Sequence, residues 1–300
     1  MKALVTGATG FVGPHLLTHL RARGDDVIEA GDFEHGFDMV DRAAVERTLT
    51  AAQPEVVYHL AARSNVADSW QDPVSTFRTN VEGTVNVLDA ARAARVQRVL
   101  VIGSAEEYGR ISKPVSEDAP LRPLTPYGAS KAAASLVALQ ASLASGPDTV
   151  RVRPFSHTGP GQSEHFLVPA LARRIAHAEE QNGDTIAIGN TDPVRDLCDV
   201  RDIVRAYRLL VEYGASGDVY NVCSGEGISV GALAARLTAR AKRPLRVEVD
   251  PELVRPVEVP YLVGDPGKLQ RLTRWRREFS LDDTLDAVLA EARAGARQGS

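Results

Sequence analysis

Short runs of β-branched and other apolar residues alternate, over the first half of the chain, with longer stretches in which apolar residues recur at helical spacing. The short runs predict strands at Lys2–Thr6, Asp26–Ala30, Glu55–Leu60, Arg98–Gly103 and Thr149–Arg153. The longer stretches predict helices at Val12–Arg23, Arg42–Ala52, Pro73–Arg95 and Tyr127–Leu143. Strands that alternate with helices of this length build right-handed βαβ units. The pattern therefore predicts an α/β fold with a parallel sheet flanked by helices.

The pattern changes after Pro154, where a loop rich in glycine and proline, Thr158-Gly159-Pro160-Gly161, interrupts the alternation. Beyond the loop we predict strands near Thr185–Ile188 and Val219–Val222. Helices are predicted near Phe166–Glu180, Asp202–Tyr213, Val230–Lys242 and Leu281–Ala292. We therefore expect one domain over residues 1–154 and a smaller α/β C-terminal domain over residues 155–300, with some later segments returning to the first sheet.

The composition of the 300 residues, 44% hydrophobic and 25% charged, is that of an ordinary globular protein. The 35 basic residues are scattered and the net charge is −4, which predicts neither a nucleic-acid nor a membrane partner. No apolar stretch approaches the ~18 residues of a membrane span, and the first residues lack the apolar region of a signal peptide. We interpret the two cysteines, Cys198 and Cys223, as reduced thiols of a cytoplasmic protein.

A glycine-rich loop follows the first predicted strand and opens the first predicted helix. In a dinucleotide-binding turn the first glycine permits a tight turn, the second lets the backbone approach a pyrophosphate, and the third lets helix and strand pack closely. The helix N-terminus offers N–H groups and a positive dipole end to the phosphates. The loop predicts a Rossmann-type site for NAD(P)H, with contacts from Gly7, Thr9, Gly10, Phe11, Val12 and Gly13.

The end of the second predicted strand bears on the choice between the two cofactors. Asp32 follows this strand, and an acidic side chain there accepts hydrogen bonds from the ribose hydroxyls of NAD(H). A 2′-phosphate needs a basic partner instead, and no lysine or arginine lies between Asp25 and Asp41. The sequence therefore favours NAD(H) over NADP(H), although the acid stands one place later than is usual.

Tyr127 and Lys131 are four residues apart on a predicted helix, so their side chains share a face. We expect the Lys131 ammonium to stabilise the Tyr127 phenolate and to lower the pKa of the phenol, which then exchanges a proton with a carbinol oxygen during hydride transfer. Ser104 follows the fourth predicted strand, at the sheet edge where such folds bind ligands. Its hydroxyl can donate to the carbonyl oxygen that gains charge.

With these motifs the chain resembles the extended short-chain dehydrogenase/reductases over nearly its whole length. The resemblance rests on Thr6–Gly13, His59-Leu60-Ala61-Ala62, Thr79-Asn80-Val81-Glu82-Gly83-Thr84, Ser104 and Tyr127–Lys131. It implies that Asp38 and Met39 contact adenine and that Leu60, Ala61 and Ala62 line the cofactor groove. It also implies that Asn80 supports the active site, and that two chains form a homodimer through helices near residues 85 and 135.

Motifs in the second half resemble those of the GDP-4-keto-6-deoxy-D-mannose reductases, and in part those of the related GDP-mannose 4,6-dehydratases. They are His157–Gln162, Ile188–Asn190, Arg195–Leu197, Val219–Gly225, Arg255–Pro260 and Gly264-Asp265. By this resemblance the GDP moiety of a GDP-sugar substrate is held by Asn190, Arg195, Arg255 and Glu258. Arginine suits a diphosphate because its planar fork binds two oxygens at once.

The segment Ser104-Ala105-Glu106 distinguishes two reactions. A 4,6-dehydratase needs a base and usually a hydroxyl or acid beside it. Glu106 stands where the dehydratases keep their base, but Ala105 cannot donate a hydrogen bond. A C4 ketone reductase needs only hydride, proton and oxyanion contacts, so we favour the reductase, whose product is a GDP-6-deoxyhexose such as GDP-D-rhamnose. The alternatives are a 4,6-dehydratase or 4-epimerase and, from another class, a nucleotide-binding sensor without catalysis.

Two departures from the relatives concern the sugar site. Ser156 stands where relatives usually carry asparagine, beside His157, and Arg63 stands where they usually carry glutamine, next to Ser64. These four residues are predicted substrate contacts. The two departures leave open a variant of the usual sugar.

Overall fold

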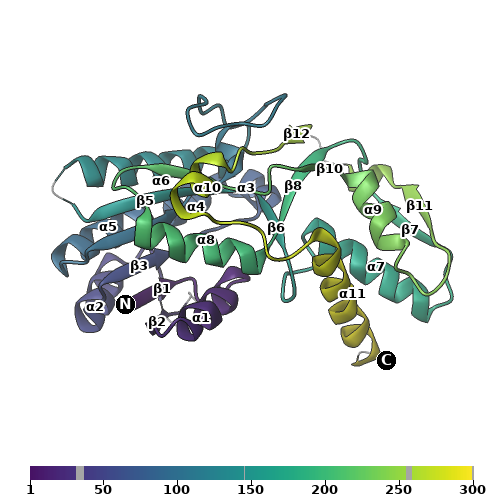
Figure 1. Cartoon of the computed structure of the whole chain (residues 1–300), viewed down its shortest axis with the longest axis horizontal. Helices are drawn as coiled ribbons and strands as arrows, with labels where there is room; N and C mark the ends of the chain where they lie inside the picture. Colours follow the sequence, from purple (N-terminus) through teal and green to yellow (C-terminus); the bar gives the residue numbers. More distant parts are fainter. Residues whose placement is uncertain (32–36, 145, 255–258, 299–300) are drawn as a thin grey trace.

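The computed structural model describes residues 1–31, 37–144, 146–254 and 259–298, and a six-stranded parallel sheet lies at the centre of its larger lobe (Figure 1). The strand order is β2 (Asp26–Ala30), β1 (Lys2–Thr6), β3 (Val56–His59), β4 (Arg98–Ile102), β5 (Asp148–Pro154) and β9 (Val219–Val222). All neighbours are parallel, as in the pairing of Leu4 with Ile28 and with Val57. The central strand β3 is buried along its whole length, because helices cover both faces of the sheet.

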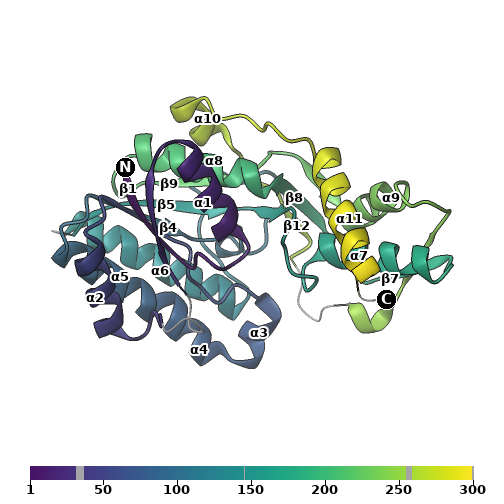
Figure 2. The ribbon, with the colours of Figure 1, turned by 90° about the horizontal axis from the view of Figure 1, so that it is seen from below.

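The helices form one layer on each face of this sheet (Figure 2). On one face, α1 (Val12–Ala22) and α8 (Val200–Tyr213) pack with Leu16, Leu20 and Ile203 against the sheet. On the other face lie α2 (Arg42–Ala52), α5 (Gly83–Ala93) and α6 (Pro126–Leu143). The predicted Rossmann-type α/β fold class is confirmed.

The helix predicted over Pro73–Arg95 is confirmed from Pro73 to Ala93, although a π-helical turn at Arg78–Glu82 divides it into α4 (Pro73–Phe77) and α5 (Gly83–Ala93). A separate short helix, α3 (Val66–Gln71), precedes it. Asp72 separates α3 from α4, since its side chain accepts a hydrogen bond from Ser75 N at 3.0 Å and Pro73 occupies the first turn of α4.

The smaller lobe contains two further sheets. The strand β8 (Val194–Asp199) pairs with β10 (Gly227–Ser229), β12 (Tyr261–Leu262) and β6 (Ser156–Thr158), and β7 (Thr185–Ile188) pairs with β11 (Arg246–Val249). The strands β6, β8, β10, β11 and β12 were not predicted, because they are short and lack a clear alternation of apolar and polar residues. The helices α7 (Leu167–Glu180), α9 (Val230–Thr238) and α11 (Leu281–Gln298) enclose the apolar core of this lobe. The helix α9 ends four residues before the predicted Lys242.

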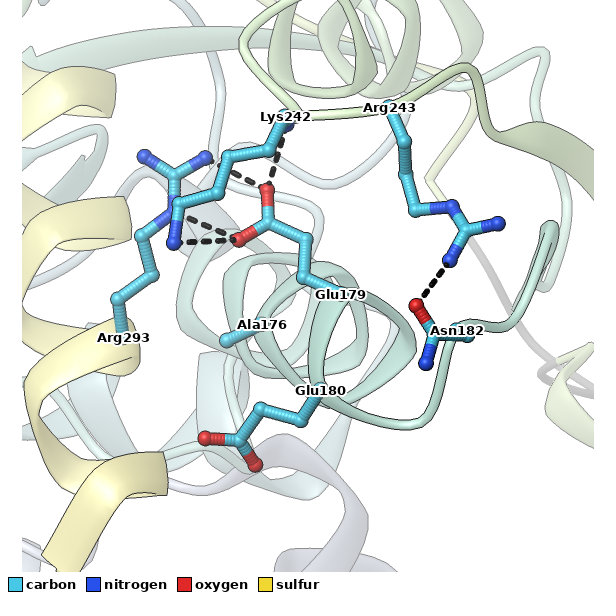
Figure 3. A pocket seen from close by; sticks show the side chains of 7 residues that line it. All are labelled: Ala176, Glu179, Glu180, Asn182, Lys242, Arg243 and Arg293. Carbon is cyan, nitrogen blue, oxygen red and sulfur yellow. Dashed lines mark hydrogen bonds and ion pairs between the residues drawn. The ribbon is translucent and has the colours of Figure 1, made fainter.

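An ion-pair network joins the C-terminal helix to the smaller lobe (Figure 3). The buried carboxylate of Glu179 on α7 accepts two hydrogen bonds from Arg293 on α11, at 2.7 and 2.9 Å. It also accepts the backbone N–H of Lys242 at 2.8 Å. Each cation in this pocket is paired within the chain, Arg243 with the side chain of Asn182. The network therefore stabilises the docking of α11.

Segments of the second half complete the first sheet, since β9 pairs with β5 and α8 covers one face. A short helix, α10 (Gly267–Thr273), packs against α8 and β9. After α10 the side chain of Trp275 is buried, and its indole N–H donates to the Asp202 carbonyl at 3.1 Å. The division at residue 154 stays a prediction. In the part of the chain that the structure describes, no helix has the length and apolar character to cross a membrane.

Candidate active site

A cavity of about 1090 Å³ opens beyond the carboxyl ends of β1, β3, β4 and β5 and is lined by residues of both lobes. Ligands of open parallel sheets bind at this position. The predicted cofactor, catalytic and substrate residues that line it are Gly7, Thr9, Gly10, Phe11, Val12, Gly13, Asp38, Met39, Leu60, Ala61, Ala62, Arg63, Ser64, Ser104, Glu106, Tyr127, Lys131, Ser156 and His157.

The glycine-rich loop has the shape that a dinucleotide requires. Gly7 has φ +67°, and a Cβ there would lie 2.7 Å from the backbone nitrogen of Ala61. A Cβ at Gly13 would lie 2.0 Å from the Ala8 carbonyl oxygen, so the first turn of α1 packs directly on the loop after β1. At Gly10 the nearest atom would lie 3.4 Å away, so its surface stays open to the cavity. The tight turn at Gly7, the open surface at Gly10 and the close packing at Gly13 are the three features that a pyrophosphate-binding loop requires.

The end of the cavity where we predict the adenosine of the cofactor is lined by Asp38 and Met39, together with Gly31, Phe37 and Val40. The Asp38 carboxylate accepts the backbone N–H of Val40 at 2.9 Å, which fixes this loop. Asp32, predicted to contact the ribose, lies outside the described residues. The preference for NAD(H) over NADP(H) therefore stays a prediction.

A buried histidine, His59, directly precedes the cavity-lining residues Leu60 and Ala61. His59 contacts the hydroxyl of Thr6 at 2.9 Å through Nδ1 and the hydroxyl of Thr84 at 3.1 Å through Nε2. Burial lowers the pKa of His59 to about 3, so the ring is neutral at physiological pH. The ring thereby joins the end of β1 to the start of α5.

Ser104 is the N-cap of a 3₁₀ turn, Ala105–Glu107, that follows β4. Its hydroxyl accepts the N–H of Glu106 at 3.1 Å and shares a hydrogen bond with the Tyr127 phenol. The helix α6 begins beside this turn, and a Cβ at Gly128 would lie 2.7 Å from the Glu106 carbonyl oxygen. The close approach places Tyr127 against Ser104, and both line the cavity with Lys131.

The pKa expected for Tyr127 is wrong in direction for this structure. Burial raises the pKa of the phenol, the negative charges of Glu106 and Glu107 raise it further, and the Ser104 hydrogen bond opposes them. Burial also lowers the pKa of Lys131, to about 8. At neutral pH Tyr127 is therefore protonated, as a proton donor must be, and most Lys131 side chains carry a charge.

Asn80 is buried and does not line the cavity. Its side chain accepts the N–H of Arg63 at 2.8 Å and donates to the Arg63 carbonyl at 3.1 Å and to the Ser130 hydroxyl at 2.9 Å. Ser130 in turn donates to the Tyr127 carbonyl at 2.7 Å. Asn80 thus joins the loop after β3 to the first turn of α6.

The predicted sugar contacts lie on two sides of the cavity. Arg63 Nη1 pairs with the Asp72 carboxylate at 3.1 Å. On the opposite lobe the His157 ring stacks on Phe11 with centroids 6.0 Å apart, and burial lowers the pKa of His157. A neutral imidazole at this place contacts both the glycine-rich loop and the substrate side of the cavity.

The predicted GDP contacts are only partly described. Asn190 follows β7 and accepts the N–H of Asp192 at 3.1 Å, and it does not line the cavity. Arg195 lies on β8 and also does not line it, although its β12 partner Leu262 does. Arg255 and Glu258 lie outside the described residues.

Several lining residues were missed by the sequence analysis. Ser75 on α4 and Arg78 and Thr79 in the π-helical turn line the cavity, which the prediction of one regular helix did not indicate. Ser163 and Phe166 come from the loop before α7. The glycine- and proline-rich stretch before them was the available signal.

Comparisons with known proteins agree with this geometry. The chain matches the model of the family described as GDP-mannose 4,6 dehydratase over residues 29–288. It is 32% identical to the GDP-6-deoxy-D-mannose reductase of Pseudomonas aeruginosa, over 99% of both chains. The structure of RMD from Pseudomonas aeruginosa complexed with NADPH has a TM-score of 0.90 at 31% identity, and the match covers 98% of this chain and 100% of that one. The UDP-glucose 4-epimerase of Thermus thermophilus in complex with NAD has a TM-score of 0.88 at 28% identity, covering 98% and 99%.

Proposed function

This chain belongs to the GDP-mannose 4,6-dehydratase family, and from that premise we propose that it reduces the C4 ketone of a GDP-4-keto-6-deoxyhexose with NAD(P)H. The observation that carries the proposal is the convergence of Ser104, Tyr127 and Lys131 in one cavity with the glycine-rich loop. The product is a GDP-6-deoxyhexose of the GDP-D-rhamnose type.

NAD(P)H, when bound, supplies the hydride that adds to C4 of the sugar. As the new carbon–hydrogen bond forms, the carbonyl π electrons move onto the C4 oxygen, which takes the proton of the Tyr127 phenol. The Ser104 hydroxyl donates a hydrogen bond to the same oxygen while its charge develops. The Lys131 cation stabilises the phenolate that remains on Tyr127 and holds the nicotinamide ribose.

The cavity favours a reductase over a 4,6-dehydratase. Dehydration needs a base for the C5 proton and an acid for the leaving C6 hydroxyl. Glu106 lines the cavity and can serve as the base, which keeps the dehydratase as the second candidate. Ala105, beside it, is buried and has no proton to give. In the reductase Glu106 orients a sugar hydroxyl.

The GDP moiety is bound, in this proposal, by Asn190, Arg195, Arg255 and Glu258 in the substrate domain, residues 155–300, while residues 1–154 bind the cofactor. Ser64, Arg63, Ser156 and His157 contact the sugar. The two cysteines are buried and unpaired, which supports a reducing, cytoplasmic setting.

A homodimer through α5 and α6 is part of the proposal. These helices pack against one another and carry exposed apolar side chains, among them Val85, Leu136 and Leu143. Exposed apolar side chains on two adjacent helices support an interface at this face. Light scattering after gel filtration should give a dimer for the wild type and a monomer for Leu136→Glu. Leu272→Glu, at an exposed position of α10, should remain dimeric.

The activity is tested by supplying GDP-4-keto-6-deoxymannose with NADH or NADPH and following nicotinamide absorbance and product identity. Stoichiometric oxidation of the cofactor with formation of a GDP-6-deoxyhexose is expected. Conversion of GDP-mannose to the 4-keto-6-deoxy sugar without net cofactor use would instead establish the dehydratase.

A further inference from the structure

A buried ion pair lies directly behind the catalytic serine. Glu107, the last residue of the 3₁₀ turn, is fully buried, and Arg153 on β5 is 4% exposed. The Arg153 Nε donates to Glu107 Oε2 at 2.8 Å. Removing two such charges from water costs several kcal/mol per ion before their attraction offsets it. Stability alone therefore does not explain why two charged side chains are buried in this position.

The second carboxylate oxygen of Glu107 contacts the backbone of the active-site residue Ser104. Glu107 Oε1 accepts the backbone N–H of Ser104 at 2.8 Å, while the Ser104 hydroxyl caps the same turn, so the two residues form a capping box. A Cβ at Gly103 would lie 2.2 Å from Oε1, so only glycine admits the carboxylate here. The carboxylate thereby fixes the backbone from which the Ser104 hydroxyl projects.

The pair is itself fixed on its far side. Arg153 Nη1 donates to the Tyr108 hydroxyl at 3.0 Å and to the Glu117 carbonyl at 3.3 Å. The Tyr108 hydroxyl donates in turn to Asn221 Oδ1 on β9 at 2.7 Å. Glu107 is thus held by strands from both halves of the chain.

The charges around Glu107 come from three elements and the loop that follows its turn. Its own segment contributes Glu106 and Tyr108, the strand β5 contributes Arg151 and Arg153, α6 contributes Tyr127 and Lys131, and the following loop contributes Glu117. Burial lowers the pKa of Lys131, and the negative charge of Glu107 opposes this shift.

We propose that Glu107, oriented by Arg153, is a positioning residue that aligns Ser104 and places a negative charge near Lys131. The inference rests on the proposed ketone reduction, in which both groups act. It assigns to a side chain outside the cavity the control of two side chains inside it.

The test replaces Glu107 with glutamine, which keeps the shape and an acceptor for Ser104 but removes the charge. Loss of the Lys131 proton ends the cationic form as pH rises, so the alkaline limb of kcat/KM should move about 1 unit to lower pH. At pH values above the alkaline limbs of both proteins, kcat/KM of the variant should be about tenfold lower than that of the wild type. The pH dependence of NADPH affinity, followed by nicotinamide fluorescence without substrate, should shift in the same direction. Glu107→Asp keeps the charge but shortens the reach to Ser104, so kcat should fall while the limb stays in place.

The matched control is Asp202→Asn. Asp202 is equally buried and paired with Arg205, and it lies outside the cavity lining. This variant should lose stability but keep both pH profiles. If Glu107→Gln does not fold, the double variant with Arg153→Met removes both charges at once, and its limb should move in the same direction by a smaller amount, because the loss of the Arg153 cation partly offsets the loss of the Glu107 charge.

The outcomes separate the inference from the proposed function. An unshifted limb in Glu107→Gln, or an equal shift in Asp202→Asn, would overturn the inference while ketone reduction by the wild type stands. Absence of ketone reduction by the wild type would overturn the proposed function. In that case a shifted NADPH-binding profile in Glu107→Gln alone would still support the control of Lys131.

Discussion

Replacing Gly7 with alanine should destabilise the protein in two ways, through the left-handed backbone conformation and through a steric clash with Ala61. The alanine must adopt φ +67° and place its Cβ 2.7 Å from the nitrogen and 2.8 Å from the Cα of Ala61. The left-handed conformation alone costs about 1 kcal/mol. The backbone of Ala61 must also retreat by several tenths of an ångström, and overpacking of this kind costs about 1–3 kcal/mol.

Gly24→Ala is the matched control. Gly24 has φ +77°, and no heavy atom lies within 4 Å of its Cβ position, so only the conformational cost applies. For a chain of this size, 1 kcal/mol corresponds to a change in Tm of about 2 °C. We expect Tm to fall by about 2 °C in Gly24→Ala and by about 4–8 °C in Gly7→Ala.

The two variants should also differ in cofactor binding. Ala61 lines the cavity beside the glycine-rich loop, so its displacement should weaken NADPH at least about tenfold in Gly7→Ala, or ~1.4 kcal/mol. Gly24→Ala should bind NADPH like the wild type. Differential scanning calorimetry and fluorescence titration measure both quantities. Equal losses of Tm in the two variants, or unchanged affinity in Gly7→Ala, would refute the role assigned to the contact with Ala61.

Three further predictions follow from the described contacts. Tyr127→Phe should lower kcat by about 10²–10⁴ through loss of the proton donor, with NADPH affinity retained in fluorescence titrations. Because the pKa of Lys131 is about 8, kcat/KM of the wild type should fall as pH rises above this value, and a flat profile to pH 10 would contradict the role of the Lys131 cation. Glu179→Ala should destabilise the protein by about 1 kcal/mol in urea unfolding, because Arg293 and Lys242 lose their partner, while kcat stays unchanged.

Local patterns predicted the elements of the first sheet well. The bounds of β1 and β2 match the predictions residue by residue, because short apolar runs are delimited by glycine or charged residues. Ser104, Tyr127 and Lys131 could be predicted as site residues for the same reason, since their motifs lie within short segments, and all three line the cavity. The strand β8 was not predicted because its buried residues include Asp196, a charged residue that does not fit an apolar strand pattern. The Asp196 carboxylate accepts three backbone N–H groups from distant loops.

Interactions between segments that are distant along the chain could not be predicted from the sequence. The pKa of Tyr127 depends on its burial and on the charges of Glu106 and Glu107, which no spacing along a helix reveals. The pairing of Glu107 with Arg153 spans 46 positions, and only the alignment of β4 with β5 brings the two together. A charged residue after a predicted strand indicates a surface side chain until its partner is known.

The pairing of β5 with β9 has a consequence for how the chain reaches its native state on the ribosome. The outer edge of β5, ending at Pro154, acquires its neighbour only when Val219–Val222 has been made, roughly seventy residues later. At 5–20 residues per second, translation leaves this edge unpaired for several seconds or more. Unpaired strand edges recruit other strands, so newly made chains should depend on chaperones or low concentration during that interval.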